Sequence, residues 1–284
     1  MSVLSLTVIL KVILVICALG ATGVGFVFLI KYVQEVVRAA EKPVPLKLAG
    51  VPWWVNEELE QKIYTAAIAD GEDLRVDEDA AESVQKNVES LVAWLADVKV
   101  QVAHDIIEIR GRWRKPLAMV KTGLREPYYV DAEMVVLDFV AMSELPIVKV
   151  KGLSATFRTP PPGEVCREND LAAAVEILAL LDQRDRIDTS VRPLLYEIDS
   201  IDVSNFNGRQ HSRAPHIILY AKDMTEIIWG AEIGSWQRHL EVPDEEKIAR
   251  LYGHYKEYGS LQNNVKYINL CEPQERIPLP VDKY

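Results

Sequence analysis

The chain has 284 residues, of which 49% are hydrophobic and 26% charged, and its formal net charge is −10. Such a composition supports a folded core and is not that of a disordered chain. The acidic balance argues against a nucleic-acid partner, because phosphate contacts require clusters of Lys and Arg. The three cysteines form neither a disulfide framework nor a zinc pattern. A bridge between Cys166 and Cys271 would need an oxidising compartment.

The first thirty residues contain a long apolar run. Residues 12–30 carry no charge and are bracketed by Lys11 and Lys31. As a helix, 19 residues span about 28 Å, close to the hydrocarbon thickness of a bilayer. We therefore expect a short tail at 1–11 and a transmembrane helix at 12–31. Two alternatives are a buried helix of a core and a signal peptide cleaved after Ala18–Leu19–Gly20.

Small side chains recur at four-residue spacing within this run. Ala18 with Thr22, and Ala21 with Gly25, would allow two membrane helices to approach closely. The basic residues that follow the run favour a cytoplasmic position for the remainder of the chain, by the positive-inside rule. These basic residues are Lys31, Arg38, Lys42 and Lys47.

After an extended entry at 43–48, the pattern predicts two helices and then two strands. Asn56 is a suitable cap for a helix at 57–69, and a second helix is expected from Asp77 to about Leu95. The hydrophobic period then changes to two at 98–110, which predicts a β-hairpin around His104–Asp105. The predicted order is strand, helix, helix, strand, strand.

The remainder of the chain is predicted to be rich in strands, with two further helices. One helix is expected at 169–183, and another begins at Asp244 and ends at Gly259. Asn207–Gly208 is typical of a two-residue hairpin turn. The expected strands are at 116–120, 128–130, 135–139, 147–150, 194–203, 215–220, 226–229 and 265–270.

No motif for catalysis, for a metal or for a cofactor is found. The five histidines include no pair at helical spacing, and no phosphate-binding loop or nucleophile elbow is present. The polar residues before Gly208 do not have the spacing of a calcium loop. The sequence therefore offers no candidate catalytic residue, and we expect no cofactor. A hydrolase is the alternative, and a deep pocket with converging titratable groups would favour it.

Several short motifs, in a fixed order, resemble the FtsQ/DivIB family of bacterial cell-division proteins. Trp94–Val100 resembles the family's entry to a second strand, and Leu145–Gly152 resembles its L-P-x-I-x-G segment. The chain departs from the family pattern at a turn glycine, here Met134, and at a final arginine, here Cys271. The further matching segments are Ile107–Ala118, Tyr129–Leu137, Ile227–Gly230, Lys247–Leu251 and Tyr267–Leu270.

The resemblance implies an α+β fold class: an N-terminal single transmembrane helix, a POTRA-like β-α-α-β-β module, and a mixed β-rich domain with packed helices. The implied boundaries are 44–115 for the POTRA-like domain, 116–271 for the FtsQ-like β-domain and 272–284 for a Pro-rich tail. The family places the bulk of the chain outside the cytoplasm, in a single-pass protein of the bacterial inner membrane. This expectation conflicts with the positive-inside rule.

By the same resemblance, the protein would be a non-enzymatic, membrane-anchored scaffold of the division machinery at the septum. Its partners would be FtsB/FtsL-type proteins, with other division proteins binding through the POTRA-like domain. A terminal strand at 265–270 would offer an open sheet edge. The expected partner-binding residues are Tyr267, Ile268, Leu270, Tyr255 and Tyr258. A POTRA-containing protein of secretion or outer-membrane assembly is the alternative function.

Overall fold

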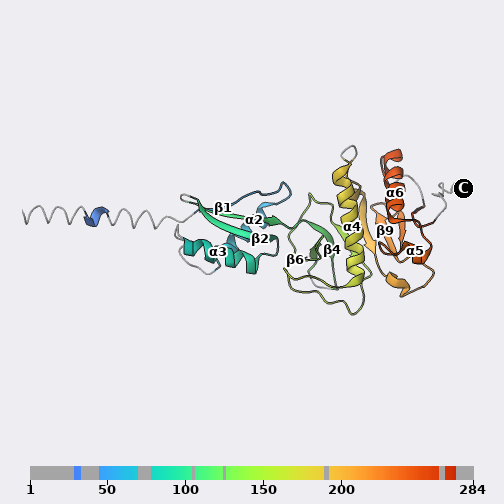
Figure 1. Cartoon of the computed structure of the whole chain (residues 1–284), viewed down its shortest axis with the longest axis horizontal. Helices are drawn as coiled ribbons and strands as arrows, with labels where there is room; N and C mark the ends of the chain where they lie inside the picture. Colours follow the sequence, from blue (N-terminus) through green and yellow to red (C-terminus); the bar gives the residue numbers. More distant parts are fainter. Residues whose placement is uncertain are drawn as a thin grey trace, which may run out of the picture.

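The computed structural model describes residues 29–32, 45–69, 78–103, 106–123, 126–188, 192–261 and 266–272. The fold is α+β and contains two sheets, one of three strands and one of eight. Figure 1 shows the small sheet with its two helices on one side of the large sheet, and α5 and α6 at the opposite side of the large sheet.

The prediction of a transmembrane helix at 12–31 is not supported and is corrected. In the part of the chain that the structure describes, no helix is both long and apolar enough to cross a membrane. Residues 12–28, including the predicted packing positions Ala18, Ala21, Thr22 and Gly25, lie outside the described residues. Over the described residues the fold class is therefore α+β with no membrane-spanning helix. The predicted inner-membrane location, which depended on that helix, is not supported either.

The small sheet is built from β1 (Leu46–Leu48), β2 (Leu95–Ala103) and β3 (Ile106–Trp113), in the order β1-β3-β2. β1 pairs with β3 in parallel, and β2 pairs with β3 antiparallel. Helices α2 (Glu57–Ala67) and α3 (Glu78–Leu91) lie between β1 and β2 along the chain. This is the strand and helix order expected from the sequence, although the predicted turn at 104–105 lies outside the described residues.

Local sequence signals explain where these two helices begin and end. The Asn56 side chain accepts a hydrogen bond from the backbone N–H of Leu59 at 3.0 Å, as expected of a helix cap. The second helix is shorter than predicted, because it ends at Leu91 and Leu95 already begins β2. Asp97 has a φ of 53° and lies at a register shift between Ala96 and Lys99, so β2 contains a bulge near its start.

The large sheet has the strand order β11-β10-β9-β8-β7-β4-β5-β6. β4, β7 and β8 are neighbours that run parallel, and β10 and β11 are parallel as well. The strands are β4 (Pro116–Val120), β5 (Tyr128–Asp131), β6 (Val136–Leu137), β7 (Val148–Lys151), β8 (Ile198–Asp202), β9 (Ile217–Ala221), β10 (Glu226–Gly230) and β11 (Tyr267–Asn269).

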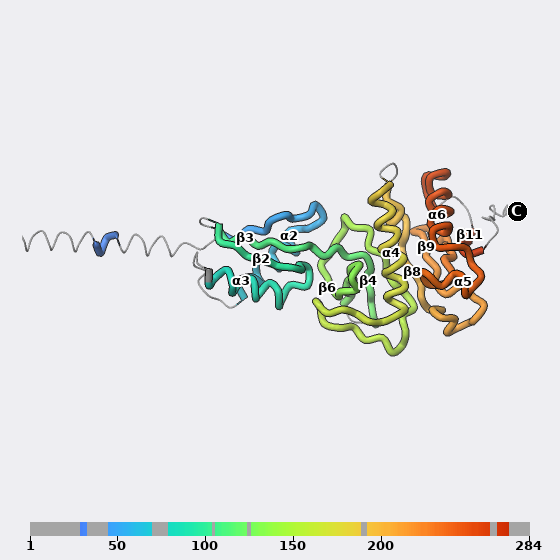
Figure 2. Tube along the Cα trace, in the orientation of Figure 1, coloured from blue at the N-terminus to red at the C-terminus, as the bar shows by residue number. Residues whose placement is uncertain are grey.

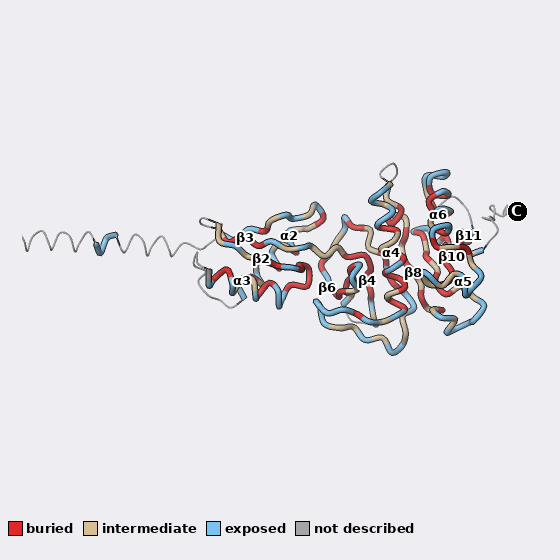
Figure 3. The backbone as a smooth tube through the Cα atoms, viewed as in Figure 1, coloured by how far each residue is buried: buried red, intermediate tan, exposed pale blue. Residues whose placement is uncertain are grey.

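Helices α4 (Asn169–Ile187) and α6 (Asp244–Tyr258) pack on one face of the large sheet, and short α5 (Trp236–His239) precedes α6. Leu171 and Leu178 of α4 and Leu251 of α6 are fully buried, and Figure 3 shows the buried side of each helix in red. Alternate strand residues point to the other side, which we call the open face. Over β5 and β6 this face is covered by the small sheet, and Tyr129 and Leu137 are buried there. The half-buried or exposed side chains on the rest of this face include Met119, Lys149, Lys151, Tyr220, Ile228, Tyr267 and Asn269.

The two sheets share a hydrophobic core at their junction. Tyr129 and Leu137 of the large sheet belong to the same buried cluster as Trp94 and Ile107 of the small one. The Trp94 and Tyr129 rings meet edge to face, with centroids 6.0 Å apart. Because this contact buries large apolar groups from both sheets, it fixes how one sheet lies on the other.

Two other predictions are corrected by the structure. Asn207 and Gly208 both have positive φ, as in the predicted turn, but they form a short 3-10 segment within the long connection between β8 and β9. The region 194–203 begins with a 3-10 turn at Leu194–Glu197 before β8. Cys166 and Cys271 are both free thiols, so the bridge considered above is not formed.

Candidate functional site

The predicted open sheet edge is found at β11. This strand is three residues long, lies at the end of the large sheet and pairs in parallel with β10. Within the described residues, no strand pairs with its outer side. Figure 2 shows β11 beside α6 and α5, at the end of the molecule farthest from the small sheet.

The hydrogen bonds of β11 show which of its backbone groups remain available. Leu270 N–H donates to the carbonyl oxygen of Ile228 at 3.0 Å, so the backbone of Leu270 faces β10. Alternate residues of a strand face the same neighbour, and the backbone groups of Tyr267 and Asn269 therefore face away from the sheet. These two residues form an unpaired edge of the kind to which another strand can be added.

The Asn269 side chain closes the far end of this edge. Its Oδ1 accepts the backbone N–H of Cys271 at 3.1 Å and that of Glu272 at 3.3 Å. Donors that would otherwise continue the ladder are thereby satisfied within the chain. An added strand can thus pair with only a short length of edge, which limits non-specific association.

The five predicted partner-binding residues are not equally accessible. Ile268 and Leu270 are fully buried and point into the core below the sheet, and Tyr255 is also buried, at 2% exposure. Tyr267 is half-buried on the open face, and Tyr258 is half exposed at the end of α6. The structure therefore brings Tyr255 and Ile268 together in the core rather than on a binding surface.

A buried lysine connects α6 to the sheet beside this edge. Lys247 is fully buried, and its Nζ donates to Glu241 Oε2 at 2.7 Å and lies 3.6 Å from Asp244 Oδ1. The same ammonium group lies over the Trp229 ring. Glu241 also accepts the backbone N–H of Ala231, immediately after β10. The network fixes the start of α6 to the end of β10, next to β11.

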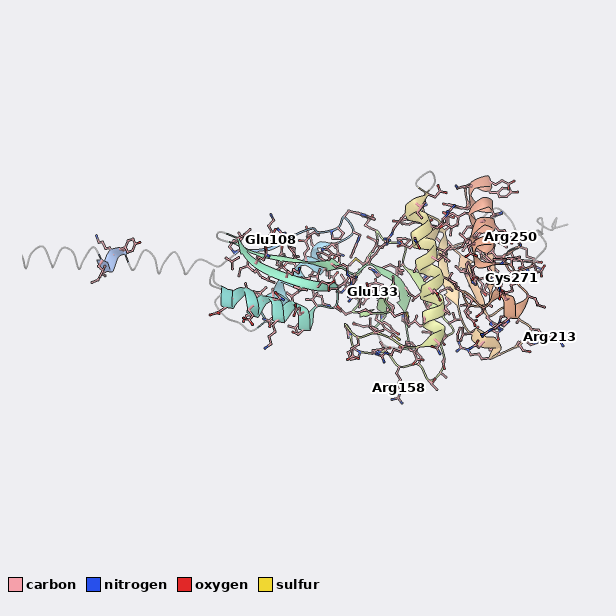
Figure 4. The ribbon with its side chains drawn as sticks, in the orientation of Figure 1. Glu108, Glu133, Arg158, Arg213, Arg250 and Cys271 are labelled. Carbon is pink, nitrogen blue, oxygen red and sulfur yellow. The ribbon has the colours of Figure 1, made fainter. Side chains whose placement is uncertain are left out.

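A groove of about 630 Å³ adjoins Tyr267 and Asn269 at the end of β11. Two of the residues that line it are His216 and His239, whose ring centroids are 4.6 Å apart. Cys271 also lines the groove, and Figure 4 shows it near Arg250 at this end of the molecule. Burial raises the pKa of the Cys271 thiol to about 11, so the sulfur stays protonated near neutral pH and is a poor nucleophile.

The described residues contain no group of three or more His, Cys, Asp or Glu side chains that could hold a metal ion. The groove beside β11 is also open to solvent on the sheet surface, and its best-buried acid, Glu241, is neutralised by Lys247. Lys247 and Glu241 hold the edge in place, whereas His216 and His239 line the groove with their rings in contact.

Sequence reasoning did not identify Lys247 or Glu241 as supports of the edge. Lys247 is four residues before the buried Leu251 and thus falls on the apolar stripe of α6. A lysine at a stripe position is a signal for a buried ion pair. Glu241 has no such signal, because it lies in the loop before α6.

No protein family model matches the chain, and no curated protein is significantly similar to it in sequence. The resemblance to the FtsQ/DivIB family therefore depends on the short motifs and the order of elements alone.

Proposed function

We propose that this protein is a non-enzymatic scaffold of the bacterial division machinery, of the FtsQ/DivIB type. It binds a partner by adding one strand of that partner to β11. The observation that supports this proposal most directly is the pair of outward-facing backbone groups at Tyr267 and Asn269. The β-α-α-β-β order of the small sheet and its helices is a second, coarser point of agreement with the family. FtsB/FtsL-type proteins are the proposed partners.

Proline substitution at the edge tests strand addition separately from folding. Asn269→Pro removes one outward-facing N–H and leaves the Leu270 bond to β10 available. Asn269→Ala is the matched control, because it also loses the side-chain cap but keeps the backbone donor. We expect pull-down of the FtsB/FtsL-type proteins from the same genome to fall at least tenfold for Asn269→Pro and less than threefold for Asn269→Ala. Equal binding by both variants would contradict strand addition.

A second experiment tests the cellular role. A fluorescent fusion of the full chain is expected to concentrate at the septum of dividing cells. The Asn269→Pro fusion is expected to lose its partner from the septum, while Asn269→Ala retains it. A uniform signal with no septal enrichment would contradict the division role.

A further inference from the structure

A second groove, of about 760 Å³, lies on the open face at the carboxyl ends of β4 and β7. These two strands are parallel neighbours, with Met119 opposite Lys149. β7 is the fourth strand along from β11 in the sheet order, which places the groove about 19 Å from the β11 edge at ~4.8 Å per strand. It is therefore a surface distinct from the strand-addition site.

The groove has a positive lining in a strongly acidic chain. Lys121, Lys149 and Lys151 line it, and none of its lining residues is acidic, whereas the net charge of the whole chain is −10. The adjacent carboxylate of Asp199 lies 2.7 Å from Lys149 Nζ and 3.8 Å from Lys151 Nζ. A second carboxylate, that of Asp202, lies beside Gly152 and opposite Lys151 in the strand register. Three ammonium groups and two carboxylates leave an excess of positive charge.

Between these cations the groove is apolar. Met119 and Phe157 contribute to its lining, and Phe157 also packs against the large core. Lys151 lies over the Tyr220 ring at 6.0 Å, so its aliphatic stem lies along the sheet surface. The combination suits an apolar side chain flanked by carboxylates.

The rim of the groove is held in one conformation. Ser154 N–H donates to Asp170 Oδ2 at 2.8 Å, and the Arg209 guanidinium donates to the same oxygen at 2.9 Å and to the Gly152 carbonyl. Gly152 has a φ of 74°, and a Cβ there would lie 2.5 Å from Ser204 N. A groove formed in advance loses little conformational entropy on binding.

We propose that this groove binds an acidic segment of a partner protein, in which carboxylates flank an apolar residue. The charge of the lining is complementary to such a segment, while the acidic remainder of the molecule repels it elsewhere. Strand addition at β11 is not required for this contact.

The test uses the full chain and three fluorescein-labelled peptides measured by fluorescence anisotropy at 50 mM salt. The probe is Gly-Glu-Glu-Phe-Glu-Glu-Gly, and its two controls replace the four Glu by Gln or the Phe by Gly. We expect saturable binding of the probe and at least tenfold weaker binding of both controls. The double variant Lys121→Glu with Lys151→Glu is expected to bind the probe at least tenfold more weakly.

The control variant is Lys99→Glu with Lys222→Glu, which makes the same charge change at exposed lysines on other surfaces. We expect it to change the affinity less than twofold. If the two double variants lost affinity for the probe equally, binding would depend only on the net charge of the protein and not on the groove, and the proposal would be overturned. Binding of the probe that does not saturate would also overturn the proposal. Displacement of the probe by inorganic phosphate, at an equal concentration of charge, would overturn it as well, because it would indicate a general anion site.

Discussion

At the scale of single residues, Gly230 is a position where the backbone conformation and the surrounding atoms both disfavour any side chain. It ends β10 with a φ of 94°, and a Cβ there would lie 2.4 Å from the Glu241 carboxylate. That carboxylate is held by Lys247 and by the Ala231 N–H. An added methyl group would therefore meet a strained backbone and displace a half-buried charge at the same time.

We expect Gly230→Ala to lower the free energy of unfolding by about 2–4 kcal/mol, from backbone strain and a broken charge network together. Gly234→Ala is the matched control, because Gly234 also has positive φ but nothing lies within 4 Å of its added Cβ. Its expected cost is about 1 kcal/mol. Guanidinium unfolding followed by circular dichroism measures both, and equal costs would contradict the role of Glu241.

Residue-scale signals in the sequence were reliable where the chemistry is local. Asn56 caps its helix through its own side chain, and Gly259 ends α6 with a φ of 71°. Ile268 and Leu270, which the sequence predicts as partner contacts, have side chains buried in the core, because a strand alternates and α6 covers one of its two sides. Tertiary packing of this kind cannot be predicted from the residues of the strand alone.

At the scale of elements, α6 is the helix that supports the proposed edge, and His254 lies within it. His254 is buried at 4% exposure, and its ring lies 4.7 Å from that of Tyr258. Neither ring nitrogen has a hydrogen-bond partner among the described residues. Burial lowers the pKa of His254 below its ordinary value of 6.5, against a smaller opposing effect of Glu257.

We expect this histidine to make the protein less stable in mild acid. The unfolded chain takes up a proton at His254 as the pH falls through 6.5, whereas the folded chain resists it, so the free energy of unfolding decreases below that pH. The loss at pH 5.5 relative to pH 7.5 is at most about 1.4 kcal/mol from this group. His254→Phe should show a smaller loss between those pH values, and an identical loss would contradict the assignment.

Element boundaries show why some of the fold could not be predicted. The apolar stripe of α3 continues in register to Leu95, so periodicity alone extends the helix by one turn too many. The structure ends the helix at Leu91 and uses Trp94 and Leu95 in the core of the junction. Trp94 contacts Tyr129, which is distant in sequence, and a tertiary contact of this kind cannot be predicted from the periodicity of the helix.

At the scale of the whole molecule, ion pairs reinforce the shared core between the two sheets. Arg114 Nη1 donates to Asp131 Oδ2 and to Glu133 Oε2, each at 2.8 Å. Arg112 also binds Glu133, and hydrogen bonds from these two arginines lower the pKa of Glu133. Glu133 lies between the two sheets in Figure 4. The sequence predicts the two modules, but no motif in it predicts these ion pairs, which join residues of one module to residues of the other.

We expect Arg114→Met to destabilise the protein by about 3 kcal/mol, because it leaves the buried Asp131 carboxylate without its cation. Arg110→Met is the control, since Arg110 pairs with Glu108 at an exposed site and its loss is expected to cost less than about 0.5 kcal/mol. Urea unfolding of the two variants distinguishes these outcomes. A small effect of Arg114→Met would indicate that the junction depends on the apolar core alone.

The strand order of the large sheet also affects how tightly a partner could bind if it contacted both β11 and the groove at β4 and β7. β11 and the groove at β4 and β7 are parts of one continuous sheet, so their separation is set by three intervening strands and cannot change without breaking the ladder. A partner that carried an extended strand and an acidic segment joined by a linker matched to this span would engage the second surface as an intramolecular event. Its effective concentration there would be on the order of millimolar, so two weak contacts would together give tight binding.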